Sequence, residues 1–137
     1  MPSYVVKAEI ADPGAKNFSF VRMKTMYDGR EIAAGDEIFI FAGGTRGGEG
    51  LVARGIVTAV EAATKPRNAV RWTPRVSIAV RRTALVKRPL GREHLKAWRG
   101  RNDGSPQAEL DFKFYRQATD KIGGIGDATA RFLARFF

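Results

Sequence analysis

Strict alternation of apolar and polar residues recurs along this chain, and it restricts the chain to a fold rich in β-strands. In residues 4–10 every second residue is apolar, while Lys7 and Glu9 fall on the opposite face. Residues 75–81 repeat the pattern, with apolar side chains inward and an arginine at each end. A period of two residues is typical of half-buried strands, because successive side chains point to opposite faces.

Three further stretches are predicted to be strands. Residues 37–41 are apolar on both faces, which indicates a central strand. Residues 51–61 predict a long strand interrupted at Gly55, and a glycine inside a strand often marks the bulge or sharp coil that a barrel requires. Residues 110–115 alternate again and predict the last strand.

Short helices are predicted between the strands and at the C-terminus. The first spans residues 19–27, where Ser19 can cap a helix and three apolar residues share one face: Phe20, Met23 and Tyr27. Residues 91–98 predict a second helix. Asp127 is predicted to cap the final helix, in which Phe132 and Phe136 lie one turn apart.

These patterns predict an α+β fold: a mixed β barrel of about five to six strands with short flanking helices and a C-terminal helix. The chain has 137 residues, so residues 1–137 are expected to form a single domain. No stretch approaches the roughly 18 apolar residues of a membrane helix, and the N-terminus lacks the pattern of a signal peptide. We therefore expect a cytoplasmic protein with no membrane contact, and a monomer is favoured.

The positive charge of the chain is concentrated in one segment. The net charge is +10, and residues 65–101 hold 12 cations against one acid, Glu93. Trp72 and Trp98 are interleaved with these cations, although the helical spacing of Trp98 favours core packing. Arginines bind phosphates and aromatic rings stack on bases, so nucleic acid, either DNA or RNA, is the expected partner. Eight cations are candidates for the nucleic-acid backbone: Arg46, Arg67, Arg71, Arg75, Arg81, Arg82, Lys87 and Arg88.

Catalytic chemistry has little support in the sequence, and the chain is expected not to be an enzyme. There is no cysteine and a single histidine, His94, which a solvated surface position accounts for. The carboxylates are scattered, so no metal site and no cofactor are expected.

Two glycine-rich segments invite a phosphate-binding interpretation. Residues 43–50 lack the lysine and following helix of a Walker loop, so a plain strand connector is favoured over a loop that closes on a ligand. Residues 122–133 look like half of a helix-hairpin-helix motif, whose turn offers amides to a DNA phosphate. A helix cap is favoured there, because the preceding residues are predicted to be a strand and Asp127 would repel a phosphate.

The order of these segments resembles the EVE domain, a member of the PUA-like superfamily. Residues 4–9 (YVVKAE) are similar to that family's first strand, and residues 35–41 (GDEIFIF) to its second. Residues 50–57 (GLVARGIV) resemble the glycine-bounded third strand, and residues 114–119 (FYRQAT) fall where the family places its final strand.

The resemblance implies a PUA-like pseudo-barrel that reads a modified base in a pocket near the first strand. Ala8 departs from the family's hydroxyl residue at its position, and the loop after Phe41 departs from the family's aromatic-and-histidine type. Two alternatives stay open: a small-molecule or nucleotide sensor, and a weak hydrolase of a nucleoside derivative acting through Lys7, Glu9 and Asp36. The pocket residues that the resemblance implies are Lys7, Ala8, Phe41, Ala42, Gly43, Trp72, Arg116 and Gln117.

Overall fold

Strands make up most of the regular structure of this protein. The computed structural model describes residues 3–10, 12, 14–43, 50–62, 75–88, 90–91, 94, 97–101, 103–111 and 120–137. Its strands are β1 (Ser3–Ala8), β2 (Asn17–Met26), β3 (Glu37–Ala42), β4 (Gly50–Ala62), β5 (Arg75–Leu85) and β6 (Lys121–Ile125). Its helices are the 3-10 helix η1 (Gly29–Glu31) and the α-helices α2 (Pro106–Leu110) and α3 (Asp127–Ala134).

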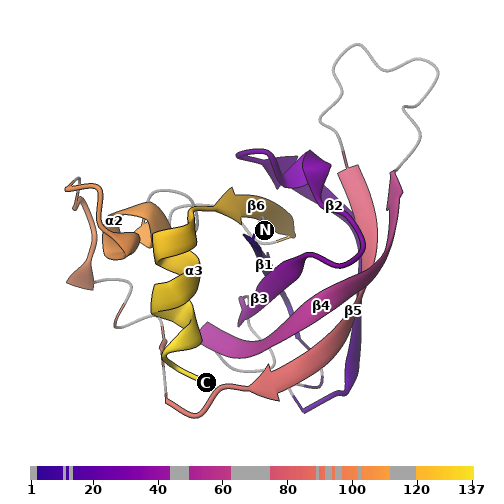
Figure 1. Ribbon diagram of the computed structural model, residues 1–137, viewed down its shortest axis with the longest axis horizontal. Coiled ribbons are helices and arrows are strands. Elements are labelled where there is room, and N and C mark those ends of the chain that lie inside the picture. Colours follow the sequence, from indigo (N-terminus) through magenta and orange to yellow (C-terminus); the bar gives the residue numbers. More distant parts are fainter. Residues whose placement is uncertain are drawn as a thin grey trace.

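The six strands close into a barrel in the order β1, β3, β4, β5, β2, β6 (Figure 1). β1 is parallel to β3 and antiparallel to β6, and β2 is parallel to β6. The other neighbouring strands are antiparallel. The prediction of a small mixed barrel with short helices, one of them C-terminal, is confirmed. No helix among the described residues is long and apolar enough to cross a membrane.

The barrel interior holds the inward residues that the alternation predicted. Tyr4, Val6, Ala8 and Ile10 of the first stretch all belong to this buried cluster. The inward residues of β5 are buried there as well: Val76, Ile78 and Val80. Burial of these apolar side chains supplies the main driving force for closing the barrel.

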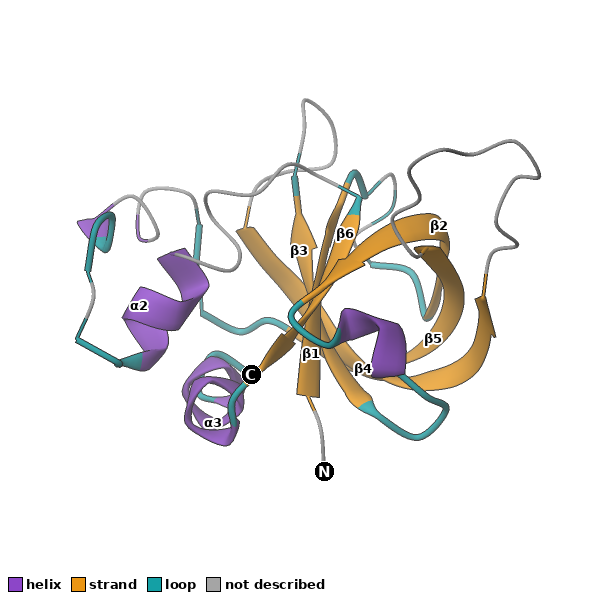
Figure 2. Ribbon diagram, turned by 90° about the horizontal axis from the view of Figure 1, so that it is seen from above, coloured by secondary structure: helices purple, strands orange, loops and turns teal. Residues whose placement is uncertain are grey.

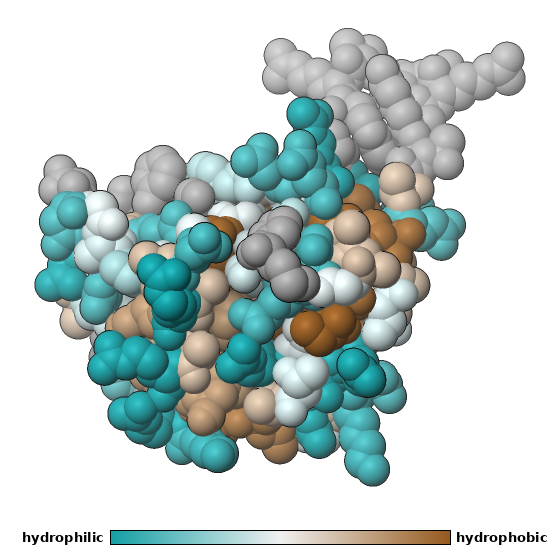
Figure 3. Space-filling model, viewed as in Figure 1, coloured by the Kyte–Doolittle hydropathy of each residue, from teal (hydrophilic) through white to brown (hydrophobic). Residues whose placement is uncertain are grey.

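A second apolar cluster lies outside the barrel, under the helices. Val5, Phe39 and Phe41 point outward from β1 and β3 and pack with Leu110 and Leu133 from α2 and α3. Figure 2 shows both helices on one side of the barrel. Figure 3, which views the face that carries α3, shows hydrophilic side chains at its margins and apolar patches between them. This layer explains why residues 37–41 are apolar on both faces.

The helix predicted over residues 19–27 is wrong, because residues up to Met26 belong to β2. Phe20 pairs with Ile78 and Met23 with Val76, so one extra residue stands between the two pairs on β2. This bulge gives inward residues the three-residue spacing that imitates a helical face.

Two expectations near the C-terminus are also wrong. Leu110 ends α2 instead of starting a strand, and Ser105 caps that helix by accepting a hydrogen bond from the Ala108 amide at 3.2 Å. The remainder of the predicted strand, residues 112–115, lies outside the described residues. Gly126 is the N-cap of α3, and Asp127 is its first helical residue.

The helix-hairpin-helix interpretation of residues 122–133 fails, because its first part is strand β6. Its glycine amides already have acceptors: the Gly124 amide donates to the Tyr27 carbonyl at 2.9 Å, and the Gly126 amide donates to Glu109 Oε1 at 2.9 Å. These amides are therefore not offered to a phosphate.

Other local predictions agree with the structure. The register of β4 against β5 shifts between Arg54 and Gly55, as the interrupting glycine indicated. Phe132 and Phe136 contact each other at a ring distance of 5.5 Å, and Trp98 packs against Phe132 at 5.7 Å. Of the helix predicted over residues 91–98, His94 and Ala97 are described as helical.

Candidate functional site

Five of the eight predicted pocket residues lie together at the ends of β1 and β3. Lys7 pairs with Phe41 and Ala8 with Ala42, and the Gly43 amide donates to the Ala8 carbonyl at 2.9 Å. The other three predicted pocket residues lie outside the described residues: Trp72, Arg116 and Gln117.

Only Lys7 brings a polar side chain to this group. Ala8 and Ala42 belong to the barrel interior, where they are 3% and 5% exposed. Phe41 is fully buried in the cluster under the helices. Lys7 is half-buried and lies on the outward face of β1. The pocket as a whole stays a prediction, and Lys7 is the described residue best suited to meet an anion.

Four cations from four neighbouring strands stand side by side, and we call them the cationic row. Lys7 of β1 pairs with Lys121 of β6, Lys121 pairs with Lys24 of β2, and Lys24 pairs with Arg75 of β5. Neighbouring strands are about 4.8 Å apart, so the row extends over roughly 14 Å.

The row lies on the outer surface of the barrel because each of its members is next to an inward residue. The inward neighbours are Val6, Ile122, Met23 and Val76. Neither Lys24 nor Arg75 forms an ion pair with a described residue, although Arg75 Nη1 donates to the Arg22 carbonyl at 3.0 Å. Like charges on directly opposite residues destabilise a sheet, so an anion bound between Lys24 and Arg75 would relieve the repulsion of that pair.

The backbone of Asp120 joins two strands of the row. Its amide donates to the Lys7 carbonyl at 2.7 Å, and its carbonyl accepts from the Lys24 amide at 3.0 Å. Asp120 adopts a left-handed conformation with φ of 65° to do so. Asp120 is exposed and directly precedes Lys121 in the sequence.

Two arginines in the described part of residues 65–101 are hydrogen-bonded to the protein's own backbone. Arg82 Nη1 donates to the Gly14 carbonyl at 2.7 Å, and Arg88 Nη2 donates to the Arg135 carbonyl at 2.5 Å. Both side chains therefore tie segments of the chain together. Arg81 and Lys87 are exposed. Of the eight predicted backbone contacts, Arg75 joins the cationic row, and three lie outside the described residues: Arg46, Arg67 and Arg71.

Lys24 and Lys121 were missed by the sequence reasoning. Lys121 is the only cation of β6, Lys24 shares β2 with Arg22, and no long charge run marks either lysine. Lys24 was also placed within a predicted helix, which hid its outward position on a strand. Only the pairing of β2 with β6 brings the two lysines together.

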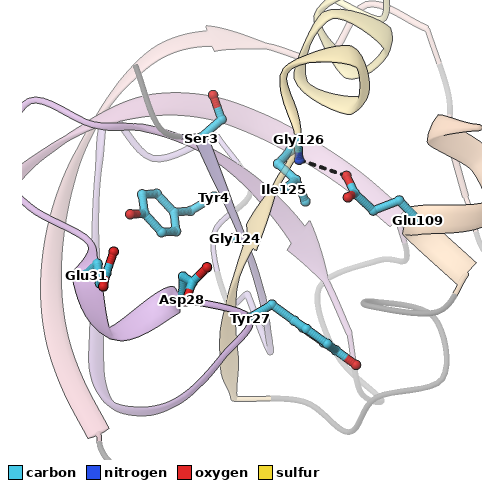
Figure 4. A pocket seen from close by; sticks show the side chains of 9 residues that line it. All are labelled: Ser3, Tyr4, Tyr27, Asp28, Glu31, Glu109, Gly124, Ile125 and Gly126. Atoms are coloured by element: carbon cyan, nitrogen blue, oxygen red, sulfur yellow. Dashed lines mark hydrogen bonds between the residues drawn. The ribbon is translucent and has the colours of Figure 1, made fainter. Parts of the chain in front are cut away.

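A separate cavity of about 360 Å³ lies at the opposite ends of the same strands (Figure 4). Two tyrosines and three acids contribute side chains to its wall, which is formed by Ser3, Tyr4, Tyr27, Asp28, Glu31, Glu109, Gly124, Ile125 and Gly126. None of these residues was singled out as a site residue from the sequence.

Close backbone packing builds this cavity. A Cβ atom on Gly124 would collide with the Tyr27 carbonyl oxygen, and one on Gly29 would collide with the Ile122 carbonyl oxygen. These two glycines let η1 lie directly against β6. Tyr27 and Asp28 both adopt left-handed backbone conformations, with φ of 47° and 66°, as the chain turns from β2 into η1.

Burial raises the pKa of the Tyr4 hydroxyl, and the negative charges of Asp36, Glu31 and Asp28 raise it further. All of these causes disfavour the phenolate. Tyr4 therefore stays neutral at physiological pH and can donate a hydrogen bond into the cavity.

A scan against protein-family models found no match for this sequence, and a search of curated proteins found no significant match. Solved structures do match over nearly the whole chain. The human THYN1 protein, in complex with 5-methylcytosine containing DNA, is 13% identical with a TM-score of 0.67, covering 98% of this chain and 96% of that chain. The DUF55 domain of human thymocyte nuclear protein 1 is 15% identical with a TM-score of 0.64, covering 97% and 96%.

A mutant of ZmASCH from Zymomonas mobilis matches with a TM-score of 0.53 and 13% identity, covering 97% of this chain and 96% of that chain. At such identities the likeness shows the fold. The chain has the EVE/ASCH-type, PUA-like fold of these structures.

Proposed function

We propose that this protein is a nucleic-acid-binding module that holds the phosphate backbone along the cationic row. The pairing of Lys7, Lys121, Lys24 and Arg75 on adjacent strands is the observation that carries the proposal. The net charge of +10 adds long-range attraction for a polyanion. The fold shared with a human protein that was solved with methylated DNA supports the same partner class.

The spacing of the row suits a polynucleotide. A strand of a duplex carries one phosphate per roughly 3.4 Å of helix axis, so a row of roughly 14 Å can meet about four phosphates. Lysine and arginine contacts to phosphate set affinity without reading sequence. Any preference among bases must therefore come from a second feature of the protein.

That second feature, in this proposal, is a base-reading pocket at the end of β1 beside Lys7. The Ala8–Gly43 hydrogen bond keeps the ends of β1 and β3 together at this place. An extruded base costs a few kcal/mol of lost stacking, which a pocket must offset with stacking and edge hydrogen bonds. Trp72, Arg116 and Gln117 are the residues proposed to supply those contacts, by resemblance to the EVE family.

The proposed activity is binding without a chemical step. Among the described residues, no group of three or more histidine, cysteine or acidic side chains could hold a metal ion. Lys7 has a sufficient role as a phosphate or base contact, so the proposal needs no general base.

The test is a fluorescence-anisotropy titration of single- and double-stranded oligonucleotides, each with plain or methylated cytosine, at several salt concentrations. With about four phosphate contacts, log affinity for duplex should fall against log salt with a slope near −4. The double variant Lys24→Gln/Arg75→Gln should reduce the slope to about −2 and weaken binding to all sequences alike.

The matched control is Arg99→Gln/Arg131→Gln, which removes the same charge from exposed positions outside the row. It should leave the slope within one unit of the wild-type value. Equal losses in the two double variants would mean that only the net charge matters. No binding at low salt would overturn the proposal.

A further inference from the structure

Two carboxylates of the cavity at the η1 end have no cationic partner among the described residues, in a chain with an excess of cations. The chain holds 24 lysines and arginines against 14 acids. Nevertheless, neither Asp28 nor Glu31 forms an ion pair or a side-chain hydrogen bond with any described residue. Both side chains line the cavity together with Tyr4 (Figure 4).

The hydroxyl groups of two buried residues in the same wall also lack partners in the part of the chain that the structure describes. Tyr4 is 3% exposed and Ser3 is 8% exposed, and neither hydroxyl makes a hydrogen bond within the described structure. Neither hydroxyl oxygen is among the fully enclosed side-chain atoms of the described residues, and both residues line the cavity. A buried hydroxyl without a partner costs free energy unless a ligand or water satisfies it. The wall therefore offers both charge and hydrogen bonds to an occupant.

The layout of the wall favours an organic cation over a metal ion. The acids of the described structure form no cluster tight enough to ligate a metal. Asp28 and Glu31 lie on the η1 side, and Glu109 lies on the α2 side, where its Oε1 accepts the Gly126 amide at 2.9 Å (Figure 4). Between the two sides the wall includes the Tyr27 ring and Ile125.

We propose that this cavity binds an aliphatic diamine or polyamine. One ammonium group would lie between Asp28 and Glu31. The Tyr4 hydroxyl would accept a hydrogen bond from it. A second ammonium group would face Glu109, and the methylene chain would cross the apolar wall. Aromatic rings also attract ammonium groups through their faces, and a cavity of about 360 Å³ is within the usual size range for small ligands.

The test is isothermal titration calorimetry of the full chain, free of nucleic acid, with spermidine and with butylamine at low salt. Spermidine should bind with one site and at least tenfold more tightly than butylamine, which has one ammonium group. The double variant Asp28→Asn/Glu31→Gln should weaken spermidine binding at least tenfold. Asparagine tolerates the left-handed conformation of residue 28, so the variant keeps its backbone.

Controls separate this site from general attraction to acids. Glu61→Gln removes an exposed acid of β4 and should change spermidine affinity by less than twofold. Tyr4→Phe keeps the ring and should weaken binding about threefold through loss of one hydrogen bond. Circular dichroism melts verify that each variant is folded.

The proposal would be overturned by no heat of binding with millimolar spermidine, by unchanged affinity in Asp28→Asn/Glu31→Gln, or by equal affinity for butylamine. A tri-lysine peptide that binds more tightly than spermidine would overturn a small-molecule ligand in favour of protein side chains. None of these outcomes depends on nucleic-acid binding, so the two proposals succeed or fail separately.

Discussion

The same three strands carry cations near one end and lie beside the acids of η1 and α2 at the other. β1, β6 and β2 contribute Lys7, Lys121 and Lys24 to the cationic row. Three or four residues further along, the same strands reach the acidic cavity at Tyr4, at Ile125 and at the turn after Met26. At about 3.3 Å per residue, the two regions are roughly 10 Å apart along the strands.

The two regions are built by different means. The row depends on strand register alone, because any residue at those outward positions would lie in the same place. The cavity depends on the backbone, since Gly29 and Gly124 must lack side chains for η1 to reach β6. Substitutions in the cationic row should therefore change ligand binding with little effect on folding. Substitutions of Gly29 or Gly124 should reduce the stability of the fold.

The largest expected effect is on the folding of the cavity end. Gly124→Ala forces a Cβ atom against the Tyr27 carbonyl and should lower the free energy of unfolding by about 3 kcal/mol. Gly123→Ala is the matched control in the same strand, because its Cβ would meet Met26 Cγ at an ordinary 3.5 Å. Urea denaturation of both variants measures the difference. Similar losses of stability in the two variants would mean that the contact between Gly124 and the Tyr27 carbonyl does not constrain β6.

The next effect tests whether the two ends act independently. Lys24→Glu should weaken duplex binding about tenfold, or about 1.4 kcal/mol, and change spermidine affinity by less than twofold. Glu31→Lys should abolish spermidine binding and leave duplex binding no weaker than in the wild type. Anisotropy and calorimetry on the same two proteins give all four values. A variant that impairs both ligands equally would contradict the division into two regions.

A pH-dependent effect is expected from Tyr4. Its folded pKa is raised above the unfolded value of about 10 by burial and by Asp36, Glu31 and Asp28. The neutral hydroxyl therefore stabilises the fold fully below the unfolded pKa, and this stability is lost as pH rises through the folded pKa. The melting temperature of the wild type should fall more steeply between pH 9 and 11 than that of Tyr4→Phe. Parallel curves would contradict the raised pKa.

The smallest effect is electrostatic coupling between the ends. Asp28→Asn/Glu31→Gln should raise duplex affinity about twofold in 0.01 M salt, where the Debye length is about 30 Å. At 0.15 M salt the length falls to about 8 Å, less than the separation, and the gain should vanish. Anisotropy at the two salt concentrations measures it. A gain in duplex affinity that persists at 0.15 M salt would contradict a purely screened electrostatic coupling between the two regions.

Much of the barrel was predictable because its signal is local. Tyr4, Val6 and Ala8 alternate toward the interior, and the glycine at position 55 marked the register shift of β4. The predictions failed where one residue changed the period. The bulge in β2 gave strand residues a helical spacing, and Pro106 after the Ser105 cap started a helix before an alternating stretch.

The candidate site was less predictable than the fold. Lys7 was singled out through resemblance to the EVE family, and Arg75 through the density of arginines around it. Their partners Lys24 and Lys121 each lie about fifty residues from Arg75 in the sequence and are still further from one another. Only strand pairing makes these residues neighbours. Arg82 and Arg88, which the charge pattern favoured, bond to backbone carbonyls instead.

The sequence by itself determined the class of fold, the barrel interior and the excess of positive charge, because each is encoded in residue type and in spacing along the chain. The places where those cations gather follow from tertiary structure. Pairing of β1, β6, β2 and β5 assembled four cations from four separate stretches into one row. Close packing of η1 against β6 assembled the acids and buried hydroxyls of the cavity. Both outcomes depend on contacts between residues far apart in the chain, which no local pattern specifies.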